Sequence, residues 1–261
     1  MMRIYGVDAF TTEPFKGNPA CVCILDEHRA SSWMQCVAAE MNLSETAFLT
    51  GSGSRWELRW FTPRIEVDLC GHATLSSAHI LWEIGEASGE GSVEFHTKSG
   101  LLKASRSGGW IELDFPAEAP QEVAPPDHLI EALGVDALWI GKNRFDYFIE
   151  IGSEETLRKL KPDFGLLEKV QTRGVIVTSR SGSSEYDFVS RFFAPAVGVH
   201  EDPVTGSAHC CLGPYWQVKT GCADVTAYQA SERGGILKLR VGAKRVLISG
   251  KAVTVWRGNI V

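Results

Sequence analysis

An internal repeat restricts the fold of this chain more than any other feature of its sequence. Three short segments recur in the same order along the chain: residues 59–63 as 191–195, residues 71–73 as 206–208, and residues 99–103 as 234–238. The last two pairs share one offset in the numbering. A chain that carries two copies of one structural unit is expected to fold into two similar halves.

Each copy has the same predicted order of elements: a strand, an aromatic-proline corner, a glycine turn, a helix and paired strands. The helical segments, residues 73–82 and 208–216, are small and apolar on several sides, which is typical of a buried helix. The sequence therefore predicts a mixed α/β (α+β) fold with two pseudo-symmetric lobes, each a curled barrel-like sheet around a central helix. A proline-rich stretch from Phe115 predicts the boundary. The expected lobes are residues 1–116, with a last strand 250–261 returning to them, and residues 117–249.

Composition and charge exclude several classes of protein. The 261 residues are 44% hydrophobic and 22% charged, the ordinary balance of a soluble globular protein. The formal net charge of −6 makes nucleic acid an unexpected partner. The sequence lacks the long apolar run of a membrane span, and Asp8 comes too early for a signal peptide. We expect a cytoplasmic protein whose seven cysteines are mostly buried free thiols.

The two helix starts at Gly71 and Gly206 predict a binding site for an anion. The first backbone N–H groups of a helix have no partner within the helix, and together with the helix dipole they attract negative charge. Glycine at the turn lets a ligand approach the backbone closely. Two such starts in duplicated halves are expected to face one cleft and to hold a small carboxylate there. The alternative is that both glycines only make tight turns before buried helices.

Glu45 is the candidate general base. It follows a predicted helix at residues 32–41 and begins an apolar strand, where Leu43, Ala47 and Phe48 would partly remove its carboxyl from water. Desolvation raises the pKa of a carboxyl group toward the range that is useful for proton transfer. On the pattern alone, a capping or surface role for this glutamate remains open.

Three further side chains lie beside the predicted helix starts. His72 follows Gly71, Ser207 follows Gly206, and Asp202 comes shortly before the second helix. His72 could hydrogen-bond the substrate or act as a partner acid, and Asp202 could orient the substrate, relay a proton or brace its loop. The two halves therefore differ in the side chains that they bring to a shared scaffold.

Several other kinds of site lack sequence support. Cys70 precedes Gly71, but Thr205 stands where a racemase with two opposed thiols would need its second cysteine, so Cys70 is expected only to line the cleft. The seven histidines show neither H-x₃-H nor HExxH spacing, so no metal site is predicted. Nucleotide-binding glycine motifs and a GxSxG nucleophile turn are also missing.

The motifs together resemble the signatures of PhzF-like proteins, the phenazine-biosynthesis-like family within the diaminopimelate epimerase superfamily. The segments that carry the resemblance are residues 8–11, 15–20, 42–48, 59–63, 69–75 and 201–209. The resemblance implies a two-lobed fold, usually a homodimer, and an isomerase without metal or organic cofactor. It places the proton-shuttling role on Glu45, with His72, Asp202 and Ser207 in the same pocket. It also implies that Gly71 and Gly206 bind the substrate carboxylate and that Asn18 and Cys70 contribute to the pocket.

The sequence leaves three hypotheses about function. The first is an isomerase in which Glu45 removes a proton from carbon and returns it elsewhere on a small carboxylate. The second is a non-catalytic interaction protein that keeps the fold. The third is a racemase or epimerase in which Glu45 and Asp202 act on opposite faces of the substrate.

Overall fold

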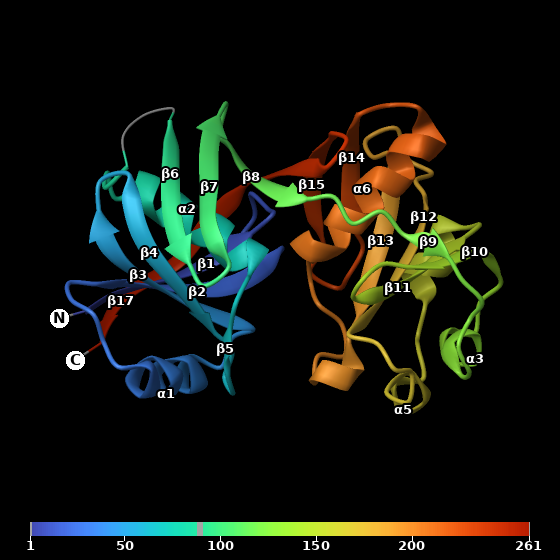
Figure 1. Ribbon diagram of the computed structural model, residues 1–261, viewed down its shortest axis with the longest axis horizontal. Coiled ribbons are helices and arrows are strands. Elements are labelled where there is room, and N and C mark those ends of the chain that lie inside the picture. The colour runs from blue at the N-terminus through green and yellow to red at the C-terminus, as the bar shows by residue number, and fades with distance from the viewer. Residues whose placement is uncertain (1, 88–90, 261) are drawn as a thin grey trace. The chain divides into compact units, whose positions relative to one another are not determined.

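Two helices rich in small and apolar residues occupy the centres of two units in the computed structural model, which describes residues 2–87 and 91–260 (Figure 1). Unit 1 comprises Met1–Asp114 together with Ser249–Val261, and unit 2 comprises Phe115–Ile248. The central helix of unit 1 is α2 (Gly71–Glu83), and that of unit 2 is α6 (Gly206–Thr220).

Unit 1 is a curled sheet whose strands pair in the order β17, β1, β2, β3, β4, β6, β7 and β8. The pairs β2–β3 and β4–β6 are parallel and the others are antiparallel, while the short β5 pairs with β4. Its strands are β1 (Met2–Ala9), β2 (Asn18–Leu25), β3 (Glu45–Ser52), β4 (Arg55–Phe61), β5 (Glu66–Val67), β6 (Ser92–Thr97), β7 (Gly100–Ser107), β8 (Trp110–Pro116) and β17 (Ala252–Ile260). Helix α1 (Ser31–Met41) connects β2 to β3 and packs on the outside of these strands.

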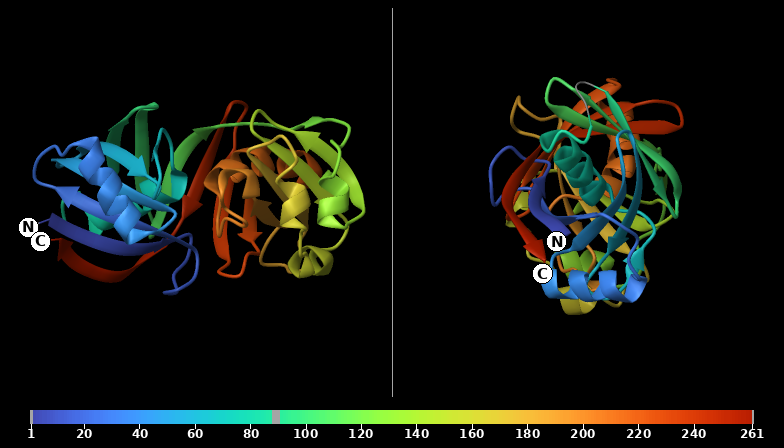
Figure 2. Two further views of the ribbon diagram at one scale, coloured as in Figure 1. Left: turned by 90° about the horizontal axis from the view of Figure 1, so that it is seen from below. Right: turned by 90° about the vertical axis from the view of Figure 1, so that its left-hand side faces the viewer.

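The two ends of the chain lie side by side in unit 1 (Figure 2). Strand β17 runs antiparallel to β1, with Met2 opposite Ile260 and Ala9 opposite Ala252. The last strand of the chain is therefore an integral part of the first unit.

Unit 2 pairs its strands in the order β9, β10, β11, β12, β13, β14 and β15, with β11–β12 and β13–β14 parallel. Its strands are β9 (Gln121–Glu122), β10 (Ala137–Lys142), β11 (Asp146–Ile151), β12 (Gly174–Arg180), β13 (Phe188–Phe193), β14 (Asp224–Gln229), β15 (Gly235–Val241) and β16 (Arg245–Gly250). Outer helices cover this sheet: α3 (Leu129–Leu133), α4 (Glu154–Lys159) and α5 (Phe164–Leu167), with a 3₁₀ turn, η1 (Pro195–Val197).

The two units share one pattern of strand pairing. In unit 1, starting from β1, successive strand pairs are antiparallel, parallel, antiparallel, parallel and antiparallel. In unit 2, starting from β10, the pairs follow the same order. The central helix comes after β4 in unit 1 and after the equivalent strand β13 in unit 2. The repeated segments 59–63 and 191–195 fall on these two strands and the turns that follow them. The predicted fold class is therefore confirmed: each half is a curled sheet around a central helix.

Burial explains why the central helices are built from small side chains. Between Ala73 and Trp82 of α2 only His79 is not fully buried, and Ala208 to Gly213 of α6 are all buried. Small residues let the strands wrap each helix closely, so most of its circumference is removed from water. A Cβ atom placed on Gly250 would lie 2.8 Å from Leu75 Cδ1, which shows how tightly the sheet of unit 1 encloses α2.

An arginine–glutamate pair recurs at the aromatic corner of both units. Arg59 donates to both carboxylate oxygens of Glu66, at 2.7 and 2.9 Å, and Arg191 donates to both oxygens of Glu201, at 2.7 and 2.7 Å. Each guanidinium also lies over the ring of a phenylalanine two residues later, in both cases on the same strand. Bidentate pairing fixes the orientation of the arginine, and the Arg59 guanidinium holds the pKa of Glu66 below its ordinary value.

Glu66→Gln is expected to reduce the free energy of unfolding by about 1–2 kcal/mol at neutral pH, because a charge-assisted bidentate pair is lost at a mostly buried site. The folded-state pKa of Glu66 lies below its unfolded value. The ion pair therefore stabilises the folded protein fully at pH values above the pKa of Glu66 in the unfolded chain. This contribution is lost as the pH falls through the pKa of Glu66 in the folded protein. Denaturant unfolding at neutral and acidic pH should show the difference between wild type and variant shrinking in acid. A difference that stays constant with pH, or that equals the effect of Glu40→Gln at an exposed position, would contradict this.

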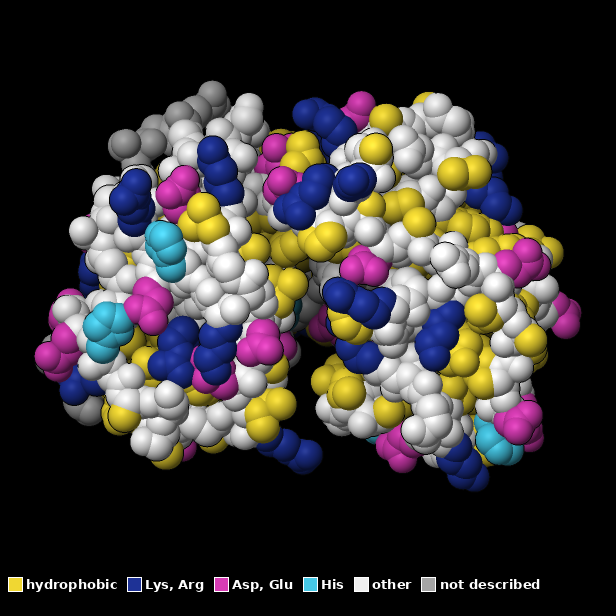
Figure 3. Space-filling view, viewed as in Figure 1, with side chains coloured by type: hydrophobic (Ala, Val, Ile, Leu, Met, Phe, Trp, Pro, Cys, Tyr) yellow, Lys and Arg dark blue, Asp and Glu magenta, His cyan; other side chains and the backbone are white. Residues whose placement is uncertain are grey.

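Several local features complete the description of the fold. Helix α3 begins only at Leu129, because the preceding His128 adopts a left-handed backbone conformation with φ of 68°. Five of the seven cysteines are buried, which confirms the expectation of mostly buried thiols, whereas Cys36 and Cys222 are exposed. In the part of the chain that the structure describes, none of the helices combines the length and the apolar character needed to cross a membrane. On the face drawn in Figure 3, basic and acidic side chains are interspersed over both units.

Candidate functional site

Glu45 is the first residue of β3, and its carboxyl group is largely buried. Helix α1 ends at Asn42, whose left-handed conformation turns the chain into β3. The Glu45 side chain keeps only 19% of its surface exposed, and this burial raises the pKa of its carboxyl group. Hydrogen bonds from Ser44 and Cys70 act in the opposite direction but are weaker. The predicted desolvation of Glu45 is thus confirmed.

His72 brings a second titratable group to Glu45. It is the second residue of α2, and its Nε2 atom lies 3.2 Å from Glu45 Oε2. On the other side of the ring, Nδ1 lies 3.5 Å from the Sγ atom of Cys70. The imidazole is therefore held between a carboxyl and a thiol, with 8% of its side chain exposed.

Ser44 connects this group to a further predicted residue, Asn18. The Ser44 hydroxyl donates to Asn18 Oδ1 at 3.4 Å and to the Pro19 carbonyl at 3.2 Å, and it lies 3.4 Å from His72 Nε2. Strands β2 and β3 are parallel and begin at the same edge of the sheet, which places Asn18 beside the start of β3. The sequence did not point to Ser44 as a site residue, although its position next to Glu45 in the turn could have indicated that it lies near the carboxyl group.

Both central helices start without a capping side chain. The N-cap residues are Cys70 for α2 and Thr205 for α6, both with extended backbone, and neither side chain accepts a hydrogen bond from the helix. The following residues are Gly71 and Gly206, as the sequence predicted. Because N-terminal N–H groups lack partners within the helix, each start has donors suited to an anion.

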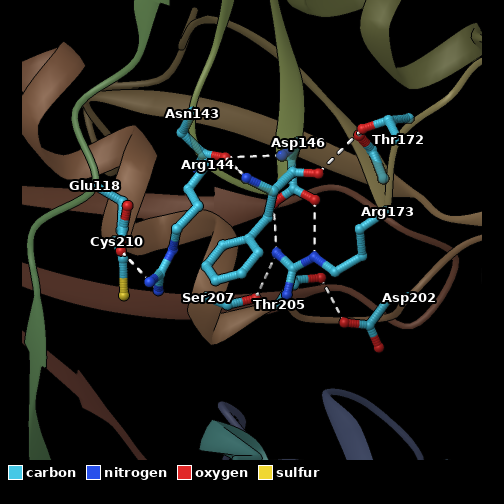
Figure 4. Close-up of polar contacts among 12 residues, drawn as sticks. Glu118, Asn143, Arg144, Asp146, Thr172, Arg173, Asp202, Thr205, Ser207 and Cys210 are labelled. Carbon is cyan, nitrogen blue, oxygen red and sulfur yellow. Dashed lines mark hydrogen bonds and ion pairs between the residues drawn. The ribbon is translucent and has the colours of Figure 1, made fainter.

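In unit 2, Asp202 belongs to a hydrogen-bonded loop in front of α6 (Figure 4). Its Oδ2 atom accepts from the Thr205 hydroxyl at 2.5 Å. Gln229, which is fully buried, donates to the Asp202 carbonyl at 2.7 Å and accepts from the Thr205 N–H at 2.8 Å. Among the roles considered for Asp202, these hydrogen bonds directly support the bracing of its loop.

Ser207 also lies in unit 2 and contacts an ion pair that the sequence did not indicate (Figure 4). Arg173 donates to both carboxylate oxygens of Asp146, a residue with no exposed surface, and also to the Ser207 hydroxyl at 3.2 Å. Arg173 precedes β12 and Asp146 begins β11, two parallel strands that start at the same edge. No motif links these positions, so only the strand pairing could have revealed the contact.

The structure thus assembles the predicted site residues in two groups. In unit 1 it brings together Glu45, His72, Cys70 and, through Ser44, Asn18. In unit 2 it places Asp202 and Ser207 around the start of α6. The unit 1 group includes three chemically different metal donors, a carboxylate oxygen, a thiol and an imidazole nitrogen, all within 4.8 Å of one another. The sequence predicted no metal site because these donors come from separate elements rather than from a spaced motif.

Comparison with known proteins identifies the family. The family model described as phenazine biosynthesis-like protein matches residues 7–258. An uncharacterized isomerase of Halalkalibacterium halodurans is 61% identical over 258 residues, covering 98% of this chain and 97% of that protein. A crystal structure from the PhzF family of Enterococcus faecalis has a TM-score of 0.94 and 41% sequence identity, covering 98% of each chain.

A more distant likeness extends the fold beyond the family. The crystal structure of a probable proline racemase from Agrobacterium radiobacter has a TM-score of 0.67 at 10% identity, covering all of this chain and 93% of that one. At this identity the likeness concerns the fold alone, which agrees with the predicted epimerase-like architecture. On the extent of the family match and the identity to its relatives, the chain belongs to the phenazine biosynthesis-like (PhzF) protein family.

Proposed function

We propose that this protein is an isomerase that moves a proton on a small carboxylate substrate, with Glu45 as the acid–base group and no required metal or organic cofactor. The observation that carries the proposal is the buried Glu45 carboxyl, with its raised pKa, beside His72 at the start of α2. The name of the relative in Halalkalibacterium halodurans, an uncharacterized isomerase, supports the same reaction class.

The environment of Glu45 suits a group that must both take and return a proton. A carboxyl whose pKa is raised holds a proton more firmly than an exposed one, so it is a stronger base when ionised and can still act as an acid. His72 Nε2 at 3.2 Å can hydrogen-bond a carboxylate oxygen of Glu45 and fix its direction. Proton transfer by such a group contributes about 10²–10⁴-fold to a rate.

We propose, as the sequence predicted, that the substrate carboxylate binds on the backbone N–H groups at Gly71 and Gly206. Neither helix start has a capping side chain, and a bound anion would accept hydrogen bonds from the backbone N–H groups of the first turn. In this arrangement Asn18 and Cys70 line the pocket in unit 1, and Asp202 and Ser207 contact polar substituents from unit 2. A homodimer in the cytoplasm is part of the same proposal and follows from the family resemblance.

Two alternatives lead to different results. A racemase or epimerase would use Glu45 and Asp202 on opposite faces of one carbon, and chiral analysis of the product would reveal it. The Asp202 carboxylate already accepts a short hydrogen bond from Thr205, which favours a bracing role over that of a second base. A non-catalytic interaction protein would bind carboxylates without exchanging any carbon-bound proton.

The test is a screen for proton exchange in D₂O. Small cyclic and amino carboxylates are incubated with the wild-type protein, and NMR follows the loss of carbon-bound proton signals. The expected result is deuterium uptake into at least one compound, at the carbon activated by its carboxylate or conjugated system, because Glu45 shares its proton with solvent between turnovers.

The matched control is Glu40→Gln, which changes an exposed glutamate on α1 of the same unit. This variant should exchange as fast as the wild type. Compounds that bind, as shown by line broadening, yet never take up deuterium would overturn the isomerase proposal in favour of the interaction protein.

A further inference from the structure

Three zinc-type donors meet at the proposed proton-transfer site of unit 1. Cys70 and His72 belong to the first turn of α2, and Glu45 comes from the start of β3. A ligand atom from each lies within 4.8 Å of the other two, and both Cys70 and His72 are buried. Acid–base catalysis on a carboxylate explains Glu45 and His72, but it gives no role to the Cys70 thiol.

The spacing of these atoms is close to that of a zinc site. Zinc bonds of about 2.0–2.3 Å in tetrahedral geometry place neighbouring ligand atoms roughly 3.3–3.8 Å apart. His72 Nε2 and Glu45 Oε2 are 3.2 Å apart, and Cys70 Sγ is 3.5 Å from Nδ1, the other nitrogen of the His72 ring. One ion can bind only one of these nitrogens, so a side-chain rotation must bring the three donors, which already lie within 4.8 Å of one another, to the same side of the ring.

The surroundings already orient the donors. The Cys70 carbonyl accepts from the Thr74 N–H at 3.1 Å and from the Thr74 hydroxyl at 2.6 Å, which anchors the first turn of α2. Ser44, itself bonded to the Pro19 carbonyl, lies 3.4 Å from the His72 ring. Fixed ligand orientation reduces the entropy that metal binding would otherwise cost, as in sites whose outer contacts hold the ligands in place.

We propose that Glu45, Cys70 and His72 form a reversible Zn²⁺ site that blocks the proton-transfer group. The ion is bound by one Glu45 oxygen, by Cys70 Sγ and by one ring nitrogen of His72, and a water molecule takes the fourth position. Binding releases the thiol proton to solvent, since the thiolate is the ligand. Apart from this S–H bond of Cys70 no covalent bond of the protein breaks, and no oxidation state changes. The blocking effect, unlike the binding itself, depends on the proposed role of Glu45.

The binding test uses cobalt(II), which reports on sulfur ligation by its spectrum. The background protein is the double variant Cys36→Ser/Cys222→Ser, because these two exposed thiols could bind metal independently of the site. Titration with CoCl₂ should give the visible bands of tetrahedral cobalt and a thiolate-to-cobalt charge-transfer band, with one equivalent bound. Addition of ZnCl₂ should remove both. Absence of the charge-transfer band would overturn the proposal.

Variants of the ligands distinguish this site from adventitious binding. Cys70→Ser in the same background should abolish the charge-transfer band and weaken Zn²⁺ binding by at least about 100-fold, since even the loss of an outer contact costs 10–100-fold. Glu45→Gln should keep the band but weaken binding by about 10-fold or more. Circular dichroism confirms that each variant is folded. A band that survives Cys70→Ser would show that another thiol binds the metal, and would overturn the assignment.

Inhibition separates this proposal from the proposed function. ZnCl₂ should suppress the deuterium exchange of the double variant at one equivalent, and a chelator should restore it. If cobalt binds with sulfur ligation but no compound is ever exchanged, the metal site stands and the isomerase proposal fails. If exchange is observed and depends on Glu45, but cobalt shows no sulfur ligation, the isomerase proposal stands and the metal site fails.

Discussion

Glu45→Gln is expected to lower the rate of proton exchange on a substrate found by the D₂O screen by about 10²–10⁴-fold, the usual contribution of general acid–base catalysis. The physical reason is that glutamine has nearly the shape of glutamate but can neither remove nor return a proton at neutral pH. Because the shape is kept, binding of the carboxylate at the helix starts should change little. The measurements are the exchange rate by NMR and the dissociation constant by line broadening or calorimetry.

The control for this prediction is again Glu40→Gln, which removes a carboxyl from an exposed position of α1. A further check is the thermal transition of both variants, which should resemble that of the wild type. An exchange rate that Glu45→Gln leaves unchanged removes this residue from the mechanism. A loss of binding equal to the loss of rate would instead assign Glu45 to ground-state recognition.

Leu75→Ala and Leu212→Ala are each expected to reduce the free energy of unfolding by about 2–5 kcal/mol, the range for leucine-to-alanine changes in a packed core. Both leucines are fully buried and lie on the central helices α2 and α6. The sheet of each unit encloses its helix closely, so the space left by the removed atoms cannot easily collapse. Hydrogen exchange should show faster opening mainly in the unit that carries the substitution.

Val218→Ala provides the matched control for the core substitutions. Val218 also lies on α6 but is 84% exposed, so its truncation should change the free energy of unfolding by less than about 0.5 kcal/mol. The core variants should lower the midpoint of thermal unfolding by roughly 5–15 °C. Equal effects of Leu212→Ala and Val218→Ala would mean that α6 is not the centre of its unit.

The repeat made the architecture predictable from the sequence. Residues 71–73 and 206–208 begin the two central helices, and the segments 59–63 and 191–195 lie on equivalent strands and the turns after them. Duplicated segments reveal a fold because both copies must meet the same local structural requirements. The buried character of α2 was equally accessible, since small apolar residues occur on all sides of it.

Local details were predictable only in part, for identifiable physical reasons. Cys36 lies on α1 away from the buried face formed by Met34, Val37 and Ala38, so helical periodicity does predict its exposure even though cysteine is usually buried. The conformation of His128 could not be predicted in this way. Its left-handed backbone delays the start of α3, and no glycine stands there to indicate such a conformation.

The candidate site was predictable in part. Glu45 and His72 follow from motif position, and their contact at 3.2 Å agrees with a common pocket in unit 1. The pair of Arg173 and Asp146 could not be found, because the two residues are separated along the chain and meet only through the parallel pairing of β11 and β12. Sequence patterns report local spacing well, but they report contacts between strands only when a repeat or a motif marks them.

The pairing of β1 with β17 has a consequence for biosynthesis. During synthesis β1 leaves the ribosome early. Strand β17, which pairs with one edge of β1, emerges only after all of residues 115–248. At about 5–20 residues per second, the synthesis of residues 115–248 alone lasts roughly 7–27 s. Unit 2 is one contiguous segment, so its strands are all synthesised before β17. Unit 1 lacks this strand until then. Completion of unit 1 thus has to wait for the synthesis of unit 2.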